Sequence, residues 1–334
     1  MKVSVIGAGS WGTALAQVLA SNGHNVGIWA RKPEGVAGIN ENHRNPRYLT
    51  DVELSPHIVA TLSYEDTLLR ARACVVVTPS HMIRGVGRAI SRVIDHDTPI
   101  LICSKGVEEG SGLLPIDVMA EEVGNKDRIA VLSGPNHAEE VIKGIYSATV
   151  IASSSEDTAV FFRDLFATDT FRTYTSEDAV GVELCAAFKN VIAIAVGISY
   201  GLGLGDNTAA MLITRGLAEM SRMVVACGGD AITCMGLAGA GDMVVTCMSE
   251  HSRNRRFGQQ YVAKGKTLED FTNETHMVVE GALACKTLET LSKRYGVELP
   301  ITDIVRDVVW NGRDVQEAAV ALSGRPLTTE FYGL

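Results

Sequence analysis

The chain has 334 residues, and its 30 Lys and Arg against 39 Asp and Glu give a formal net charge of −9. With 46% hydrophobic and 21% charged residues, the composition is that of a folded globular protein, and the length predicts two domains of roughly 100–200 residues each. The acidic balance argues against a protein that binds nucleic acid or an anionic membrane, because both contacts need a positive field.

The first half of the chain alternates short apolar runs with segments of helical period. Helices are predicted at Thr13–Ser21, Met82–Ile94 and Leu114–Val123. Strands are predicted in alternation with them, at Val3–Ile6, Val26–Trp29, Cys74–Thr78, Ile100–Cys103, Ile129–Leu132 and Thr149–Ala152. Val and Ile runs separated by helices are typical of a parallel sheet buried on both faces. We therefore expect a doubly wound, Rossmann-like α/β dinucleotide-binding domain over residues 1–178.

The second half is predicted to be helical throughout. Ser176, followed by two acidic residues, is a candidate N-cap for a long helix that ends near Tyr200. The later helices are predicted at Thr208–Cys227, Glu280–Tyr295, Asp303–Trp310 and Val315–Leu322. We therefore expect an all-α, substrate-binding domain over residues 179–334.

The cysteines and the N-terminus predict a cytoplasmic protein. The seven cysteines are odd in number and lack the C-x-x-C spacing of a zinc or redox site, so free thiols in a reducing compartment are expected. The chain enters a strand at once, which leaves no room for a secretory signal. The longest apolar run noted, Val191–Ile198, is shorter than the roughly 20 residues that span a bilayer.

The segment from Gly7 to Gly12 matches the fingerprint G-x-G-x-x-G. It follows an apolar strand, opens a helix and lies in a strand–helix–strand unit, which is the context a dinucleotide site requires. Gly7 permits the tight turn, Gly9 admits a pyrophosphate to the backbone, and Gly12 lets the helix pack on the strand. The alternative is a bare turn with glycines that serve no ligand.

The residues after the second strand indicate which dinucleotide is bound. An NAD enzyme usually has an acid there for the ribose 2′-hydroxyl. This chain has Arg31 and Lys32 instead, and two cations suit a 2′-phosphate. NADP(H) is therefore the preferred cofactor, with NAD(H) possible, unless the two cations only solvate a loop.

Charged residues in apolar or glycine-rich surroundings are the candidates for chemistry. Lys105 follows a strand, at the carboxyl end where ligands bind in such sheets. Lys189 lies in an apolar helix, either facing a polar cavity or covering apolar surface with its stem. Asp242 ends a glycine-rich turn and is either a site residue, the N-cap of the next helix, or both.

A basic run at Ser252–Arg256 places three guanidinium groups within four residues. Arginine binds phosphate bidentately, and Ser and Asn add neutral donors. Because a helix cannot aim all three at one ligand, some of them are expected to be structural or exposed.

These motifs, in this order, resemble the soluble NAD(P)-dependent glycerol-3-phosphate dehydrogenase family in its bacterial form. The resemblance spans nearly the whole chain. Its most specific parts are the Lys-Asn-Val at Lys189, the helix Thr214–Met220 and the run Ser252–Arg256. The other matching stretches are Gly7–Gly12, Val77–His81, Ser104–Gly106, Ser133–Pro135, Gly241–Asp242 and Val278–Gly281.

The resemblance implies a set of site residues. Lys189 is the implied proton donor and acceptor, with Lys105 and Asp242 beside it in the catalytic set. Cofactor contacts are implied at Gly7, Gly9, Ser10, Trp11, Gly12, Arg31, Lys32, Lys105, Ala138, Arg253, Val278 and Glu280. Substrate contacts are implied at Lys105, Gly134, Asn136, Lys189, Asp242, Ser252, Arg253 and Asn254. Asn136 departs from the bacterial pattern, which usually has Thr or Ser there, and this weakens that one contact.

The implied activity is reduction of dihydroxyacetone phosphate to sn-glycerol 3-phosphate for glycerophospholipid synthesis, by a homodimer that needs no metal. Lysine suits it because its ammonium group is a general acid at neutral pH. The alternatives are another NADP-dependent reductase of the same plan, such as a 3-hydroxy acid dehydrogenase or ketopantoate reductase, or a protein that senses NADP(H) without turnover.

Overall fold

The computed structural model describes residues 1–330 and Gly333, which form two compact units. The first unit comprises residues 1–105 and 115–179, and the second comprises residues 106–114 and 180–334. The sequence predicted a single boundary after residue 178. In the structure, the segment Gly106–Leu114 also belongs to the second unit. Arg294 explains that transfer, because its Nη2 donates to the carbonyl oxygen of Ser111 at 2.6 Å.

One eight-stranded sheet forms the centre of the first unit. Its strands are β1 (Lys2–Ile6), β2 (Asn25–Trp29), β3 (Ile58–Thr61), β4 (Cys74–Val76), β5 (Ile100–Ile102), β6 (Ile129–Ser133), β7 (Ser147–Ala152) and β8 (Phe171–Ser176). They lie in the order β3-β2-β1-β4-β5-β6-β7-β8. The expected α/β architecture is confirmed, with one correction: β6 and β7 are antiparallel, whereas the other neighbouring pairs are parallel.

The sequence prediction missed the two edge strands, β3 and β8. Both have exposed residues within them, and Val59 in β3 is 58% exposed. An edge strand needs no continuous apolar run, which is the pattern the prediction used.

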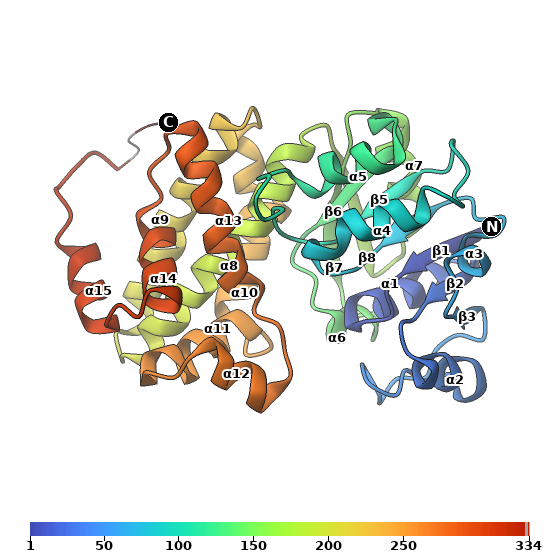
Figure 1. The fold of residues 1–334 in the computed structure, drawn as a ribbon, viewed down its shortest axis with the longest axis horizontal. Coiled ribbons are helices and arrows are strands. Elements are labelled where there is room, and N and C mark those ends of the chain that lie inside the picture. Colours follow the sequence, from blue (N-terminus) through green and yellow to red (C-terminus); the bar gives the residue numbers. More distant parts are fainter. Residues whose placement is uncertain (331–332, 334) are drawn as a thin grey trace. The chain divides into compact units, whose positions relative to one another are not determined.

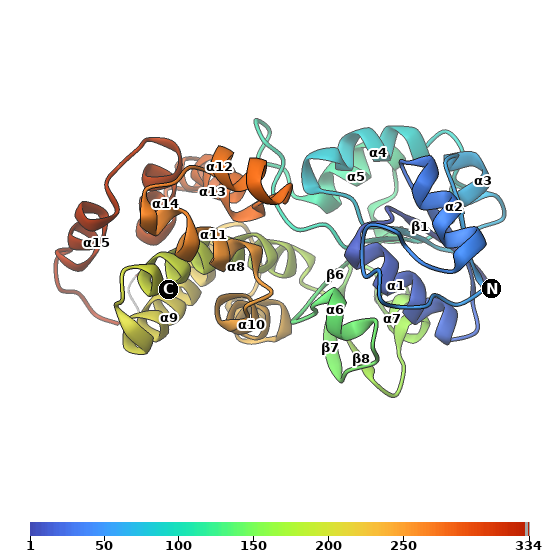
Figure 2. The ribbon, with the colours of Figure 1, turned by 90° about the horizontal axis from the view of Figure 1, so that it is seen from below.

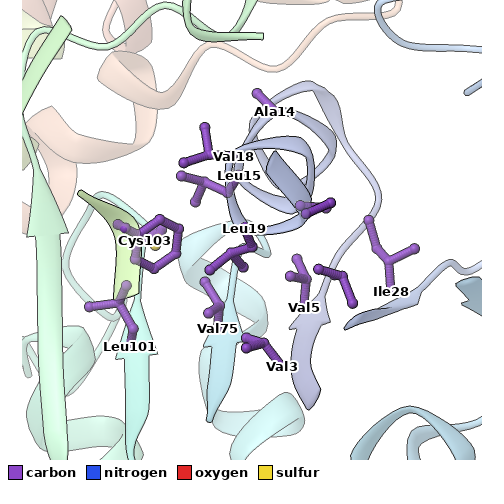
Figure 3. Close-up of a cluster of buried hydrophobic side chains, with 14 of the residues drawn as sticks. Val3, Val5, Ala14, Leu15, Val18, Leu19, Ile28, Val75, Leu101 and Cys103 are labelled. Carbon is purple, nitrogen blue, oxygen red and sulfur yellow. The ribbon is translucent and has the colours of Figure 1, made fainter. Parts of the chain in front are cut away.

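Helices cover both faces of the sheet. They are α1 (Ser10–Ser21), α2 (Pro33–Asn42), α3 (Tyr64–Leu68), α4 (Ile83–Ile90), α5 (Pro115–Val123), α6 (Ala138–Val141) and α7 (Glu156–Phe166), with 3₁₀ turns η1 (Ser80–Met82) and η2 (Lys126–Arg128). Figure 2 shows α4 and α5 on one side of the sheet and α1 and α7 on the other. In Figure 3, Leu15, Val18 and Leu19 of α1 point at the strands, where Val5 and Val75 are fully buried.

The second unit is helical, as predicted. Its helices are α8 (Ala179–Gly201), α9 (Gly205–Ala226), α10 (Asp242–Met248), α11 (Arg253–Gln260), α12 (Leu268–Thr275), α13 (Glu280–Tyr295), α14 (Pro300–Trp310) and α15 (Val315–Ser323). Between them lie the 3₁₀ turns η3 (Ala231–Met235) and η5 (Val262–Lys264) and the π-helical turn η4 (Leu237–Gly241). The expected N-cap at Ser176 is wrong: Ser176 ends β8, and its Oγ accepts from the Asp178 N–H before the helix begins.

Helix α8 is the core of the second unit, and Figure 1 shows it running among the other helices of that unit. It has 23 residues, and its most apolar stretch has a mean hydropathy of 1.8, so length and composition alone would let it cross a membrane. However, 94% of that stretch is buried inside the protein, as is usual for the core helix of a soluble protein. Close packing with α11 is possible because a Cβ at Gly197 would overlap the carbonyl oxygen of Arg255.

Candidate active site

The glycine fingerprint forms the turn between β1 and α1. Gly7 has a φ of +122°, and a Cβ on it would lie 2.6 Å from the carbonyl oxygen of Val77. A Cβ on Gly12 would overlap the carbonyl oxygen of Gly7, so both positions require glycine for packing within the protein. Gly9 differs, because a Cβ there would meet no protein atom within 4 Å.

The open space at Gly9 fits a dinucleotide. Gly9 is the N-cap of α1 and supplies no capping side chain, so the free N–H groups of the first turn are available to a phosphate. Ser10 and Trp11 lie in that turn, and the buried Nε1 of Trp11 has no hydrogen-bond partner among the described residues. Asn45 fixes the turn from outside, because its Nδ2 donates to the carbonyl oxygen of Ala8 at 3.0 Å.

Arg31 and Lys32 follow β2 and are exposed. Lys32 makes a loose ion pair with Glu34, with 3.9 Å between Nζ and Oε1, which leaves its ammonium group largely to solvent. Two exposed cations beside the fingerprint strand fit the 2′-phosphate of NADP(H).

The loops after β5 and β6 carry the remaining candidates of the first unit. Lys105 comes after β5 and is half-buried. Gly134 and Asn136 follow β6, and the buried Ala138 is the first residue of α6. Because β1, β4, β5 and β6 are mutually parallel, these loops end at the same edge of the sheet as the fingerprint.

The second unit buries an ion pair between Lys189 of α8 and Asp242 of α10. Their Nζ and Oδ1 atoms are 2.6 Å apart, and the two residues are 7% and 1% exposed. Thr246, one turn after Asp242, accepts from Lys189 Nζ at 2.9 Å, and its Oγ1 donates to Asp242 Oδ1 at 3.1 Å. A buried charge needs such pairing, so Lys189 is not a lysine that merely covers apolar surface.

Asp242 is not the N-cap of α10. The N-cap is Gly241, and Asp242 is the first residue inside the helix. The neighbouring Cys247 is excluded as a proton donor near neutral pH, because burial raises its pKa to about 12.

A second hydrogen-bond network joins the N-termini of α11 and α13 to α8. Asn190 Oδ1 accepts from Asn254 Nδ2 at 2.9 Å, and Asn190 Nδ2 donates to Glu280 Oε2 at 3.3 Å. Asn254 Oδ1 accepts from the Gly281 N–H at 2.9 Å. This network holds residues from three helices in fixed register.

The basic run is divided between the site and the surface. Ser252 is the N-cap of α11, where its Oγ accepts from the Arg255 N–H, and Arg253 beside it is exposed. Arg255 is structural, because its Nη1 donates to the carbonyl oxygen of Met248 at 2.6 Å and its guanidinium lies over the ring of Tyr200.

Each unit therefore gathers its own candidates. The fingerprint, Lys105, Gly134, Asn136 and Ala138 belong to the first, and the network of Lys189, Asp242, Asn254 and Glu280 belongs to the second. Val278 is 46% exposed, two residues before α13. Across residues 1–330 and Gly333, no group of three or more His, Cys, Asp or Glu is arranged to hold a metal ion.

Sequence reasoning missed Thr246 and Asn190 as site residues. A signal for Thr246 was present, because it lies four residues after Asp242 and shares its face of α10. The sequence indicates Asn190 only as part of the Lys-Asn-Val stretch that carries the family resemblance, with no role of its own. Its partners Asn254 and Glu280 lie 64 and 90 residues away, beyond any local pattern.

Comparison with known proteins identifies the family. Residues 2–159 match the model of the NAD-dependent glycerol-3-phosphate dehydrogenase N-terminus, and residues 178–320 match that of its C-terminus. The chain is 44% identical over 333 residues to glycerol-3-phosphate dehydrogenase [NAD(P)+] of Enterococcus faecalis, covering 98% of this chain and 97% of the relative.

Solved structures give the same result. Glycerol-3-phosphate dehydrogenase from Coxiella burnetii superposes with a TM-score of 0.92 at 35% identity, over 97% of this chain and 99% of that one. A ketopantoate reductase from Ralstonia eutropha matches with a TM-score of 0.60 at 16% identity, over 97% and 100% of the two chains, which is a likeness of fold alone. This chain belongs to the NAD-dependent glycerol-3-phosphate dehydrogenase family, whose members are oxidoreductases that use NAD(P).

Proposed function

We propose that this chain catalyses the reversible NAD(P)H-dependent reduction of dihydroxyacetone phosphate to sn-glycerol 3-phosphate, a precursor of glycerophospholipids. The observation that carries the proposal is the buried Lys189–Asp242 pair, with Thr246 on the same ammonium group. A reductase needs a proton donor held in a site from which water is largely excluded. A protein that only senses NADP(H) has no use for one.

The nicotinamide, when bound, supplies the hydride. Lys189 donates a proton to the carbonyl oxygen of the substrate, because a lysine ammonium group is charged at neutral pH. Asp242 and Thr246 hold that ammonium group in one orientation. In the oxidising direction, Lys189 takes the proton back from the hydroxyl group.

The phosphate group of the substrate is assigned to Arg253, Ser252 and Asn254. An exposed arginine at the N-terminus of α11 supports this role, because the guanidinium group and the helix N-terminus both favour an anion. Lys105 contacts substrate and cofactor at the sheet edge, where Gly134 and Asn136 complete the substrate contacts and Ala138 lies along the cofactor. Val278 and Glu280 are assigned to the nicotinamide side.

The cofactor preference is assigned to Arg31 and Lys32, which favour NADP(H) over NAD(H) through the 2′-phosphate. The fingerprint residues Gly7, Gly9 and Gly12 bind the pyrophosphate with Ser10 and Trp11. Gly9 supports this most directly, because the space beside it contains no protein atom within 4 Å of an added Cβ.

The test is to follow NADPH oxidation with dihydroxyacetone phosphate, with ketopantoate and with a 3-oxo acid. Rapid turnover of the first alone supports the proposal. Turnover of ketopantoate or the 3-oxo acid in its place would favour the alternative reductases, which share the fold. NADPH binding with no turnover of any ketone would indicate a sensor.

We also propose that the protein is a cytoplasmic homodimer. Apolar side chains exposed on the second unit support an association surface, including Ile232 at 69% and Met235 at 66% exposure. Sedimentation equilibrium of the full chain tests this, and a monomer mass at micromolar concentration would contradict it.

A further inference from the structure

Helix α10 carries both side chains that hold the ammonium group of Lys189, yet it is a short helix. It has seven residues, or about two turns. Its N-cap Gly241 supplies no capping side chain, and Val244 and Met248 are each 48% exposed. A helix this short is marginal by itself, so its orientation depends on contacts with neighbouring helices.

The C-terminal end of α10 is bound by Arg255 of α11. Arg255 Nη1 donates to the carbonyl oxygen of Met248, the last residue of α10, at 2.6 Å. This carbonyl is among the last four of the helix, which have no acceptor role within it, and a cation is favourable at that end of the helix dipole. The guanidinium group therefore both pairs and orients the end of α10.

Tyr200 of α8 fixes the guanidinium group in this position. Arg255 Cζ lies 5.0 Å from the centroid of the Tyr200 ring, and Tyr200 Oη lies 4.0 Å from Met248 Sδ. Tyr200 Oη donates to Asp206 Oδ1 at 3.0 Å, in the first turn of α9. The backbone is fixed as well, because a Cβ on Gly197 of α8 would overlap the carbonyl oxygen of Arg255. Arg255 thus joins the end of α10 to α8.

Lys189, on the same helix as Tyr200, contacts α10 through Asp242 and Thr246. Its Nζ is 2.6 Å from Asp242 Oδ1 and donates to Thr246 Oγ1 at 2.9 Å. Without Arg255, α10 could pivot about these contacts, and hydrogen bonds weaken as their distances and angles change. We infer that Arg255 is a positioning residue for proton transfer, which keeps Asp242 and Thr246 aligned on the ammonium group of Lys189. This inference rests on the proposed function.

A competing role follows from the place of Arg255 beside the residues assigned to the substrate phosphate. Its N–H donates to Ser252 Oγ, and Arg253 and Asn254 precede it in α11. If the Arg255 side chain acted through α11, its loss would weaken substrate binding and raise KM. If it acts through α10, its loss lowers kcat and leaves KM unchanged, because the interaction matters only in the chemical step.

The experiment compares Arg255→Met with Arg255→Lys in steady-state reduction of dihydroxyacetone phosphate by NADPH. Methionine removes the donor, and we expect kcat to fall about 10- to 100-fold, as for a small misplacement of a catalytic group, with KM and the Kd for NADPH unchanged. Lysine keeps a cation that can donate to Met248 and lie over the Tyr200 ring, so it should recover most of kcat. Arg313→Met, at a half-buried arginine paired with Asp307, is the control and should change neither kcat nor KM.

A double variant tests whether Arg255 acts through the contacts of Lys189. Thr246→Val removes the hydroxyl group that accepts from the ammonium group. If Arg255 aligns that contact, the loss of kcat in Thr246→Val, Arg255→Met should be smaller than the product of the two single losses. A loss equal to the product would mean that the two residues act independently, and the inference would be wrong.

Variants of Tyr200 keep the test decisive if Arg255→Met is unstable. Tyr200→Leu removes the ring under the guanidinium group and should lower kcat with KM unchanged, whereas Tyr200→Phe keeps the ring and should retain more of kcat. A raised KM with a normal kcat in Arg255→Met would place its role on the substrate phosphate and overturn the inference. Unchanged kinetics in Arg255→Met or, if that protein is unstable, in Tyr200→Leu would also overturn it.

These outcomes are distinct from a failure of the proposed function. If the unmodified protein does not reduce dihydroxyacetone phosphate at all, the proposed function is wrong. If it does so at a kcat that Arg255→Met leaves unchanged, only the role of Arg255 is wrong.

Discussion

The two units place their functional charges in opposite ways. Arg31 and Lys32 of the first unit are exposed beside a strand end, whereas Lys189 and Asp242 of the second are 7% and 1% exposed. Under the proposed function, the first unit binds the dinucleotide with backbone N–H groups and solvated cations, whose attraction for a phosphate does not depend on one fixed side-chain orientation. The second holds a charge where its orientation is fixed, which is what proton transfer requires.

The comparison predicts its largest effect at the buried lysine. Lys189→Met should lower kcat on the order of 10³-fold, the usual range for removal of a general acid, and leave the Kd for NADPH nearly unchanged. Stopped-flow or steady-state NADPH oxidation measures kcat, and fluorescence titration measures Kd.

Because Lys189→Met leaves Asp242 buried without its cation, the double variant Lys189→Met, Asp242→Asn should be measured beside it. Lys264→Met, an exposed lysine in η5, is the control. If the double variant folds and turns over near the normal rate, the proton-transfer role of Lys189 is wrong.

A second buried charge in this unit predicts a pH effect on stability. Glu219 of α9 accepts hydrogen bonds from the N–H groups of Ile301 and Thr302 at the start of α14. Burial nevertheless raises the pKa of its carboxyl group to about 7. The folded chain thus keeps a proton that the unfolded chain releases at lower pH, so this group's contribution to stability is lost as the pH rises towards 7.

Glu219→Gln should remove that dependence. Between pH 5 and 8 its free energy of unfolding should improve relative to the unmodified protein by roughly 2–3 kcal/mol, since one pKa unit corresponds to about 1.4 kcal/mol. Urea unfolding at several pH values measures the difference, with the exposed Glu269→Gln as the control. A difference that does not change with pH would show that Glu219 is ionised throughout.

The fingerprint glycines sharpen the contrast within the first unit. Gly12→Ala should lower stability by roughly 1–3 kcal/mol, because the methyl group overlaps the Gly7 carbonyl. Gly9→Ala should leave the Tm unchanged but raise the Kd for NADPH about tenfold or more, a loss comparable to one hydrogen bond. Thermal unfolding and nucleotide titration of both variants check this, and similar effects in the two would contradict the distinction.

The smallest effect is predicted at the exposed cations. Arg31→Asp should shift the ratio of kcat/KM for NADPH over NADH about tenfold towards NADH, because a carboxylate repels the 2′-phosphate. The shift should shrink in high salt, since the site is solvated. An unchanged ratio would mean that another residue recognises the 2′-phosphate.

Local patterns were enough for most of the first unit. The fingerprint from Gly7 to Gly12 lies within one strand–helix turn, so it can be recognised from the residues that surround it in the sequence. In the second unit, α13 likewise ends at Tyr295 as predicted, because Gly296 follows it in the left-handed conformation. The antiparallel direction of β7 could not be predicted, because a short apolar run has no direction until it pairs.

For the second unit, the sequence indicates some of the site residues but not which of them lie in contact. Lys189 and Asp242 are 53 residues apart, and no spacing in the sequence shows that they meet. The roles of Thr246 and Asn190 follow from hydrogen bonds between helices, which composition and period do not encode. The hydrogen bond from Asn136 to the carbonyl oxygen of Ala148 requires β7 to pair with β6, and the antiparallel direction of β7 could not be predicted.

The transfer of Gly106–Leu114 to the second unit has a consequence for cutting the protein in two. The chain passes between the units at residues 105, 114 and 179 rather than once. A fragment that ends at residue 178 would retain Ser111 but lose Arg294, so a nine-residue loop would be left without the unit that orders it. A nucleotide-binding module taken from this protein is therefore better made by replacing that loop with a short turn than by truncation.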